Sequence, residues 1–424
     1  MTTTTVTGAV EVPVDYWTRA RKTGAVLTAM GLIAILVFGT LASSSVVRFT
    51  FGVTGEGAGI NINGKVGAIL FGFIALATGA ILLLLGRHFG VLTGVSFAAF
   101  LISSLCWQIS VAPTGIQFMP VGSVAQITLD LSIPLIFGAL GGVLCERSGV
   151  VNVAIEGQFL AGAFMAAFFG SIAGSVWLGL AAAMIGGLII ALILAVFAIR
   201  YLVDQVVIGI VLNVFAAGLT GFLYEQFMRT DSTSYNLAPR VPEWEIPGLS
   251  SIPIIGPALF KGNVFTYGAF VLVAVLYFGL FKTRWGLRTR AVGEHPTAAD
   301  TVGVRVLGLR YVNVLGAGLI AGVGGAYFTL LATNSFNKNM SSGLGFIALA
   351  AMIFGRWHPI GAFLAALFFG FFNALTAYLG GISSPIPGQF LAMLPYIATI
   401  IAVAGLVGRV RAPAADGKPY LKGH

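Results

Sequence analysis

The sequence predicts an all-α polytopic membrane protein, and three observations support that prediction. Of the 424 residues, 58% are hydrophobic and only 9% are charged, and a soluble protein of this size could not cover its surface with so few polar groups. Apolar runs long enough to cross a bilayer recur along most of the chain. Lysine and arginine gather in alternate loops between these runs, as they do in membrane proteins of fixed orientation.

About twelve membrane segments follow from the length and apolar character of these runs. Most of them hold about 20 consecutive residues of low polarity, but the run at 344–356 is too short to cross the bilayer fully. The segments are expected at 25–46, 66–86, 89–107, 124–145, 151–171, 175–198, 204–225, 265–281, 311–332, 344–356, 360–380 and 389–408.

The distribution of positive charge predicts that both the N-terminus and the C-terminus lie in the cytoplasm. In this orientation the residues before the first span, the loop of residues 282–310 and the tail after the last span all carry their basic groups inside. With both termini inside, only six of the 23 basic residues lie outside, namely Arg48, Lys65, Arg229, Arg240, Lys261 and Lys338. The reverse orientation would invert this ratio of inside to outside basic residues.

Two loops are long enough to form structure of their own. The external loop from Gln226 to Asn263 holds five prolines, which favour turns and extended segments that either cap the helices or meet an external partner. The internal loop from Lys282 to Arg310 carries six basic residues and two acids. Its residues 295–300 begin with His-Pro, which favours a short surface helix. Composition leaves two interpretations open, a solvated loop that fixes topology or a docking site for a soluble partner.

Polar side chains at membrane depth are the candidate functional groups, because each costs free energy unless it faces a cavity or another helix. Each asparagine among them could join neighbouring helices or line a substrate path. The segment from Glu146 to Gln158 combines acids, an arginine and glycines, so a broken helix there would have to be buried in protein or line a water-filled path. The candidates are Asp130, Asn152, Glu156, Gln158, Asn213, Asn313 and Asn373.

The chain offers no recognisable catalytic constellation. There is no Ser-His-Asp or paired-carboxylate arrangement, and the four histidines lack the spacing of metal ligands. We therefore expect a protein that is not an enzyme and that holds no cofactor or metal. Its energy would come from a gradient or from a partner, and the net charge of +9 reflects membrane topology and not nucleic-acid binding.

Three stretches of sequence carry a family resemblance. They are PLIFGALGGVLCERSGVVNVAIEGQFLAGAF at 134–164, DQVVIGIVLNVFAAGLTGFL at 204–223, and TRWGLRTRAVGEHPTAADTVGVRV at 283–306 followed by GLGFIALAAMIFGRWHPIGAFLAALFFGFFNAL at 343–375. Together they resemble the membrane permeases of bacterial ABC importers in the branched-chain amino acid/simple sugar class, and within it the nucleoside (purine or guanosine) branch.

The resemblance implies that the 282–310 loop is a coupling segment that docks on a cytoplasmic ABC ATPase, to which ATP and Mg²⁺ would bind. It also implies a second permease subunit, non-identical in the nucleoside branch, and an external substrate-binding lipoprotein that the 226–263 loop could contact. The residues assigned to the coupling loop are Gly286, Arg288, Arg290, Gly293, Glu294, Pro296, Ala299, Asp300 and Gly303.

The implied organisation is an N-terminal extension of about three membrane helices at 1–121, a permease core at 122–408 and a cytoplasmic tail at 409–424. The implied function is import of nucleosides across the cytoplasmic membrane of a bacterium. Permeases for simple sugars or branched-chain amino acids, and a stand-alone secondary transporter, are the alternatives, because an amide-lined path with few charges suits a sugar as well as a nucleoside. The candidate substrate-path residues are Asn152, Glu156, Asn213 and Asn373.

Overall fold

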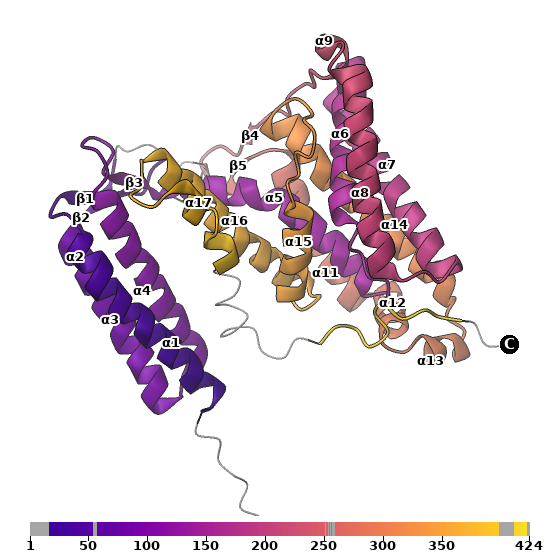
Figure 1. Ribbon diagram of the computed structural model, residues 1–424. Coiled ribbons are helices and arrows are strands. Elements are labelled where there is room, and N and C mark those ends of the chain that lie inside the picture. Colours follow the sequence, from indigo (N-terminus) through magenta and orange to yellow (C-terminus); the bar gives the residue numbers. More distant parts are fainter. Residues whose placement is uncertain are drawn as a thin grey trace, which may run out of the picture.

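The computed structural model consists almost entirely of helices (Figure 1). It describes residues 17–421 apart from 54–56, 251, 253, 255, 257–258 and 398–410. Within the described residues, ten helices are long and apolar enough to cross a membrane. The predicted all-α polytopic membrane fold is confirmed.

The first three crossing helices form a separate bundle, drawn in indigo and violet in Figure 1. Short strands at one end of this bundle form a three-stranded sheet of order β2-β1-β3, in which β1 pairs antiparallel with β2 and parallel with β3. The elements are α1 (Arg19–Ile33), η1 (Ala34–Phe38), α2 (Gly39–Leu41), β1 (Val46–Thr50), β2 (Gly59–Asn63), α3 (Gly64–Leu85), α4 (Phe89–Ser110) and β3 (Phe118–Pro120).

The remaining helices form a larger bundle around α5, in which every residue from Ser132 to Glu146 is buried. Because α5 is covered on all sides along this stretch, its sequence is apolar without a polar stripe. The helices are α5 (Val121–Glu146), α6 (Ile155–Ala173), α7 (Val176–Ala195) with η2 (Val196–Arg200), α8 (Gln205–Leu223) with η3 (Tyr224–Met228), α11 (Val264–Lys282), α14 (Val306–Tyr327) with η4 (Phe328–Ala332), α15 (Leu344–Phe354) and α16 (Pro359–Gly381).

Short elements lie at the two ends of the larger bundle. At one end are α9 (Ser232–Tyr235) and the paired strands β4 (Trp244–Glu245) and β5 (Lys261–Gly262). At the opposite end α12 (Arg284–Glu294) and α13 (Pro296–Thr301) lie beside the C-terminal tail, and the start of α1 is at this same end (Figure 1). The helix α17 (Gly388–Leu391) follows α16 and, with it, packs against the N-terminal bundle through buried residues that include Leu105, Ile109, Leu375, Leu379 and Leu391.

Helices α7 and α14 approach each other closely because glycines face glycines and alanines. A Cβ atom added at Gly318 would collide with Ala191 and Gly187, and one added at Gly322 would collide with the backbone of Ala183. Small residues are what allow such contact in a membrane, where lipid is as apolar as the side chains. Gly318 and Gly322, one turn apart on α14, therefore both lie at this helix contact.

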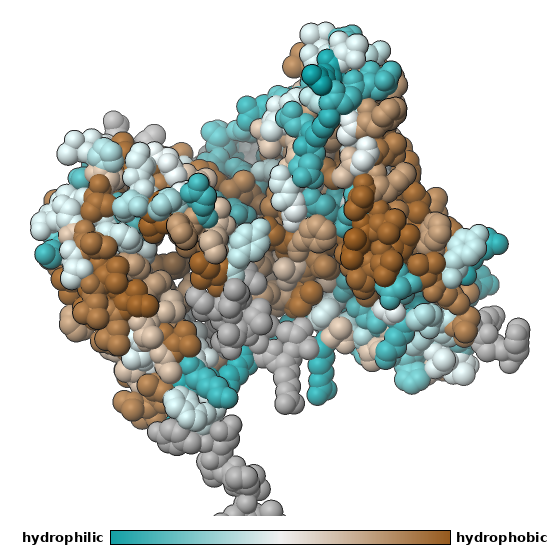
Figure 2. Space-filling view, viewed as in Figure 1, coloured by the Kyte–Doolittle hydropathy of each residue, from teal (hydrophilic) through white to brown (hydrophobic). Residues whose placement is uncertain are grey.

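The outer faces of several helices carry large apolar side chains. Figure 2 shows them as brown surface over α8 and over the N-terminal bundle, with teal polar surface near α9 and near α12 and α13. Such a band suits lipid or another apolar partner, and the polar ends suit water and head groups. On α8 the exposed large apolar residues are Val206, Val207, Ile210, Val211, Val214, Phe215, Leu219 and Phe222.

Ten of the twelve predicted membrane segments correspond to crossing helices, including the segment at 151–171, which is α6. The run at 344–356 is the 11-residue helix α15, which follows a non-helical stretch. Most of the run at 389–408 lies outside the described residues. The total of about twelve segments and the cytoplasmic position of both termini stay predictions.

Candidate functional site

The basic loop forms two consecutive helices, α12 and α13. Thr283 caps α12, because its Oγ1 accepts a hydrogen bond of 3.2 Å from the Gly286 backbone N–H. Gly286 lies directly on the backbone of Gly279 and Leu280, where a larger residue would collide, so the chain can turn sharply from α11 into α12. Pro296 occupies the first turn of α13. The predicted short helix at 295–300 is confirmed, whereas α12 was not predicted.

Helix α12 is fixed to the core on one face. Gly293 lies against the backbone of Arg147 at the end of α5, with no room for a Cβ atom. The buried side chain of Asn313 on α14 donates a hydrogen bond of 3.3 Å to Thr289 Oγ1. The Arg290 guanidinium stacks over the Phe281 ring at 5.0 Å from its centroid, a favourable cation–π contact. These contacts make α12 a rigid extension of the bundle.

The opposite face of the helix pair is open to solvent. Leu287 and Val302 are 61% and 79% exposed although both are apolar, and Arg288 is exposed between them in sequence. Apolar side chains that project from a polar, charged surface are typical of protein interaction sites. Gly303, with φ of 84°, turns the chain at the end of this face in a conformation that favours glycine. The helix pair is therefore a candidate docking surface.

The C-terminal tail returns to this helix pair. The Ala415 N–H donates a hydrogen bond of 2.8 Å to the Gly293 carbonyl, and the Ala414 N–H donates one of 3.2 Å to Glu294 Oε2. Tyr420 is buried in an apolar cluster with Val292, Ala299 and Val306. The tail thus joins α12, α13 and α14 into one unit, which the sequence interpretation did not anticipate.

Next to the tail, the buried acid Glu146 lies beside the half-buried acid Asp416. Glu146 at the end of α5 is 3% exposed and accepts a hydrogen bond from Trp357 Nε1. Asp416 from the tail lies next to it, and burial raises the pKa of Asp416 from 3.8 to about 6, although Glu146 and the nearby Arg310 charge act in the opposite direction. Arg310 is 2% exposed and donates to the Lys418 carbonyl at 3.2 Å. This largely buried ionisable cluster links the tail to the core.

Three of the four predicted substrate-path residues meet around the connection between α5 and α6. Asn152 exchanges two hydrogen bonds with Gln158, at 3.2 and 3.3 Å. Asn213 on α8 accepts a hydrogen bond of 2.8 Å from the Gly157 N–H and donates one of 2.9 Å to the Val153 carbonyl. All of these contacts are within the protein, so they fix the non-helical stretch that precedes α6.

Glu156 caps the half-length helix α15. Its carboxylate accepts hydrogen bonds from Ser341 Oγ at 2.6 Å, the Gly343 N–H at 2.8 Å and the Gly345 N–H at 2.7 Å. A carboxylate at a helix N-terminus satisfies unpaired N–H groups and interacts favourably with the helix dipole. In the non-helical stretch before α15, the Asn236 side chain from the external loop accepts a hydrogen bond from the Phe336 N–H and donates one to the Phe336 carbonyl. The break in the span is therefore supported by polar side chains, as a broken membrane segment requires.

Asn373 lies apart from that network. It is half-buried on α16, and among the described residues no hydrogen bond to its amide is present. The roles of Asn152, Glu156, Asn213 and Asn373 in a substrate path stay predictions. Ser341 and Thr289, which complete the two polar networks, were not predicted, because isolated hydroxyl residues carry no signal in sequence.

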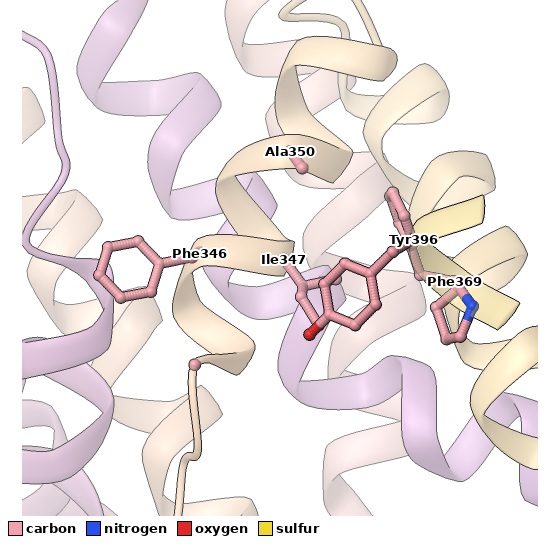
Figure 3. Close-up of a pocket in the computed structure, with 7 residues that line it drawn as sticks. Phe346, Ile347, Ala350, Phe369 and Tyr396 are labelled. Carbon is pink, nitrogen blue, oxygen red and sulfur yellow. The ribbon is translucent and has the colours of Figure 1, made fainter. Parts of the chain in front are cut away.

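An apolar pocket of about 260 Å³ opens beside the start of α15. It is lined by Phe346, Ile347 and Ala350 of α15, Phe369 of α16 and the segment of Tyr396. Figure 3 shows Ile347 and Tyr396 next to each other at this pocket, with Phe346 directed away from them. Since its lining is largely hydrocarbon, the pocket suits an acyl chain or a flat ring better than a hydroxyl-rich solute.

The fold is that of a multi-pass membrane protein with a candidate docking surface at one end. The chain belongs to the family of permease components of branched-chain amino acid transport systems, whose model matches residues 124–404. The predicted resemblance to ABC importer permeases is confirmed, and the protein is a multi-pass protein of the cytoplasmic membrane. The boundaries of the extension, core and tail stay predictions.

Three relatives illustrate the family. The guanosine ABC transporter permease protein NupQ of Bacillus subtilis is 44% identical over 71% of this chain and 97% of its own length. The nucleoside ABC transporter permease protein NupC of Lactococcus lactis is 41% identical over 69% of this chain and 95% of its own length. The glucose ABC transporter permease protein TsgB13 of Haloferax volcanii is 26% identical over 65% and 74%, respectively. No solved structure matches the chain.

Proposed function

We propose that this protein is the membrane permease subunit of an ATP-driven importer of nucleosides. The observation that supports this substrate is the similarity to two nearly full-length permeases named for guanosine and for nucleosides, at 44% and 41% identity. The polar groups inside the bundle are mostly amides and hydroxyls. A solute path lined by such groups would be compatible with a neutral solute that carries many hydroxyl groups.

We further propose that α12 and α13 dock on a cytoplasmic ATPase subunit, which would bind ATP and Mg²⁺. The exposed Leu287 and Val302 would enter a groove of that subunit. Because Gly293 and Thr289 fix α12 to α5 and α14, a movement of the ATPase would be transmitted to the spans as a rigid-body displacement.

Two further partners belong to this proposal. A second permease subunit, non-identical to this one, would complete the pore, and the exposed apolar faces offer it a surface. An external substrate-binding protein would meet the loop of residues 226–263. That loop folds back on the bundle, since the Ala238 and Val241 N–H groups donate to the Asn334 and Leu330 carbonyls at 3.0 Å each.

Uptake of labelled guanosine in cells with and without the gene tests the substrate. We expect uptake to be lost without the gene, to return with it, and to be inhibited by other nucleosides but not by glucose or leucine. Intact guanosine uptake together with loss of glucose or leucine uptake would keep the importer architecture and replace the substrate. Glucose is the second candidate, because one relative of 26% identity is a glucose permease.

Co-purification of the ATPase tests the docking surface. Val302→Asp places a charge on an exposed side chain and should leave the fold intact, but it should weaken ATPase binding about tenfold or more, as loss of a central apolar contact does. Leu237→Asp is the matched control, because Leu237 is 67% exposed on the external loop. Equal ATPase recovery with both variants would exclude this surface.

A further inference from the structure

A polar cavity of about 220 Å³ lies at the external-loop end of the core, apart from the networks described above. Two of its residues, Gln126 and Asp130, are one turn apart on α5, and Tyr327 comes from the end of α14. Arg240 and Glu243 from the external loop line its rim. The sequence marked Asp130 as a polar residue at membrane depth, and its side chain lines this cavity.

The external loop is held in place over this cavity. The Val241 N–H donates to the Leu330 carbonyl at 3.0 Å, and β4 pairs with β5 through Trp244 and Gly262. Asn263, which also lines the cavity, caps α11 by accepting hydrogen bonds from Phe265 and Thr266. Since the walls are fixed by backbone hydrogen bonds on two sides, the cavity is a formed site and not a gap left by a mobile loop.

The cavity presents hydrogen-bonding groups that the protein itself leaves unused. Among the described residues, no hydrogen bond to the side chains of Gln126, Asp130 or Tyr327 is present. Lys261, by contrast, is paired with Glu245 at 2.7 Å and is less available to a ligand. A carboxylate, an amide and a phenol around one cavity offer several acceptors with a few donors. Polar groups in such a position cost free energy unless a ligand or water satisfies them.

Charge narrows the class of ligand. The lining carries two carboxylates, Asp130 and Glu243, and two cations, Arg240 and Lys261, so the charges around the cavity balance and do not favour an anionic or a cationic solute. A carboxylate accepts hydrogen bonds from two adjacent hydroxyl groups with its two oxygens, and a bond to a charged acceptor is stronger than one between neutral groups. A neutral solute with neighbouring hydroxyls, such as the ribose of a nucleoside, therefore fits this set of groups.

We propose that this cavity binds the adjacent ribose hydroxyls of the transported nucleoside, with Asp130 as the acceptor of both and with Gln126 and Tyr327 beside it. The proposal rests on nucleoside transport as the function and adds a ligand subsite to it. It places the first contact of the solute with the permease at the end where an external binding protein would release it.

The test compares guanosine with 2′-deoxyguanosine, which lacks one of the two hydroxyls. Transport is measured in the complete importer in proteoliposomes, at saturating substrate, so that the affinity of the external binding protein does not set the rate. Asp130→Asn should lower guanosine transport about tenfold and leave 2′-deoxyguanosine transport nearly unchanged, because one charge-assisted hydrogen bond is lost. Tyr327→Phe, which removes only a hydroxyl, should lower guanosine transport by a smaller factor.

Asp231→Asn is the matched control, since Asp231 caps α9 on the same external loop and asparagine is an equally good cap. It should leave both rates unchanged. An equal loss of both rates in Asp130→Asn, or an unchanged ratio between them, would overturn the subsite while nucleoside transport stands. A wild-type importer that moves neither nucleoside would overturn the proposed function and the subsite with it. Loss of leucine transport in Asp130→Asn would assign the carboxylate to an ammonium group instead.

Discussion

Asn213 illustrates how a single polar residue in a membrane helix stabilises a neighbouring loop. Asn213 is 7% exposed, and its side-chain amide accepts a hydrogen bond from the Gly157 N–H and donates one to the Val153 carbonyl. The peptide groups of that stretch have no helical partners, so the side chain replaces hydrogen bonds that lipid cannot supply. The same residue stays a candidate for a substrate path, although both groups of its amide are already hydrogen-bonded to the protein backbone.

We predict that Asn213→Leu lowers the stability of the protein as well as uptake. The Gly157 N–H and the Val153 carbonyl would both lose their partner, at about 1–3 kcal/mol for each buried group. Thermal unfolding in detergent measures this loss. Asn213→Asp keeps the acceptor for Gly157 and should be destabilised less. A variant Asn213→Leu with normal stability and impaired transport would assign the amide to the solute.

Asp416 gives the attachment of the tail a pH dependence. Burial raises its pKa to about 6, so the docked tail favours the protonated acid. The contribution is complete below the ordinary value of 3.8 and is lost as the pH rises through about 6. Arg310 and Glu146 are the charged and titratable groups that face Asp416.

Hydrogen exchange of the tail amides, corrected for the intrinsic rate, tests this prediction. The Ala415 amide bonded to Gly293 should be up to about tenfold more protected at pH 5 than at pH 7.5. In Asp416→Asn the side chain cannot ionise, so the difference between the two pH values should disappear. Equal protection of the wild-type tail at both values would contradict the assignment.

Among the elements, α7 and α14 are the pair whose contact depends most on residue size. Gly322→Ala adds a Cβ atom where the backbone of Ala183 already lies. The helices must separate, and such overpacking costs about 1–3 kcal/mol. We expect a lower thermal midpoint and less folded protein in the membrane. Gly218→Ala on α8, where nothing lies within 4 Å of the new atom, should be neutral, and equal effects of the two changes would refute the packing argument.

At the scale of the whole molecule, the open question is which side each end faces. The charge distribution predicts that α13 is cytoplasmic and α9 is external. The native cysteines Cys106 and Cys145 are both buried, so labelling by a thiol reagent should come from the introduced cysteine alone. A membrane-impermeant maleimide should label Thr233→Cys on intact cells and Thr297→Cys only after the membrane is opened. The reverse pattern would invert the topology.

The sequence by itself determined the class of fold, the position of most spans and the short helix that begins at Pro296. These features depend on local properties, since apolar runs of about 20 residues, charge bias and the Pro296 helix start can each be read within one window. The family segments are also continuous in sequence. A property that one window contains needs no knowledge of the rest of the chain.

Only the tertiary structure decided what the polar residues contact. Glu156 meets Ser341 across 185 positions of sequence, and the tail at Ala414 meets Glu294 across 120 positions. The role of each group depends on which distant segment returns to it, and no periodicity records that. In lipid every buried polar group needs such a partner, so the sequence could mark the candidates while the fold alone assigned Glu156 to a helix cap and Asp130 to an open cavity.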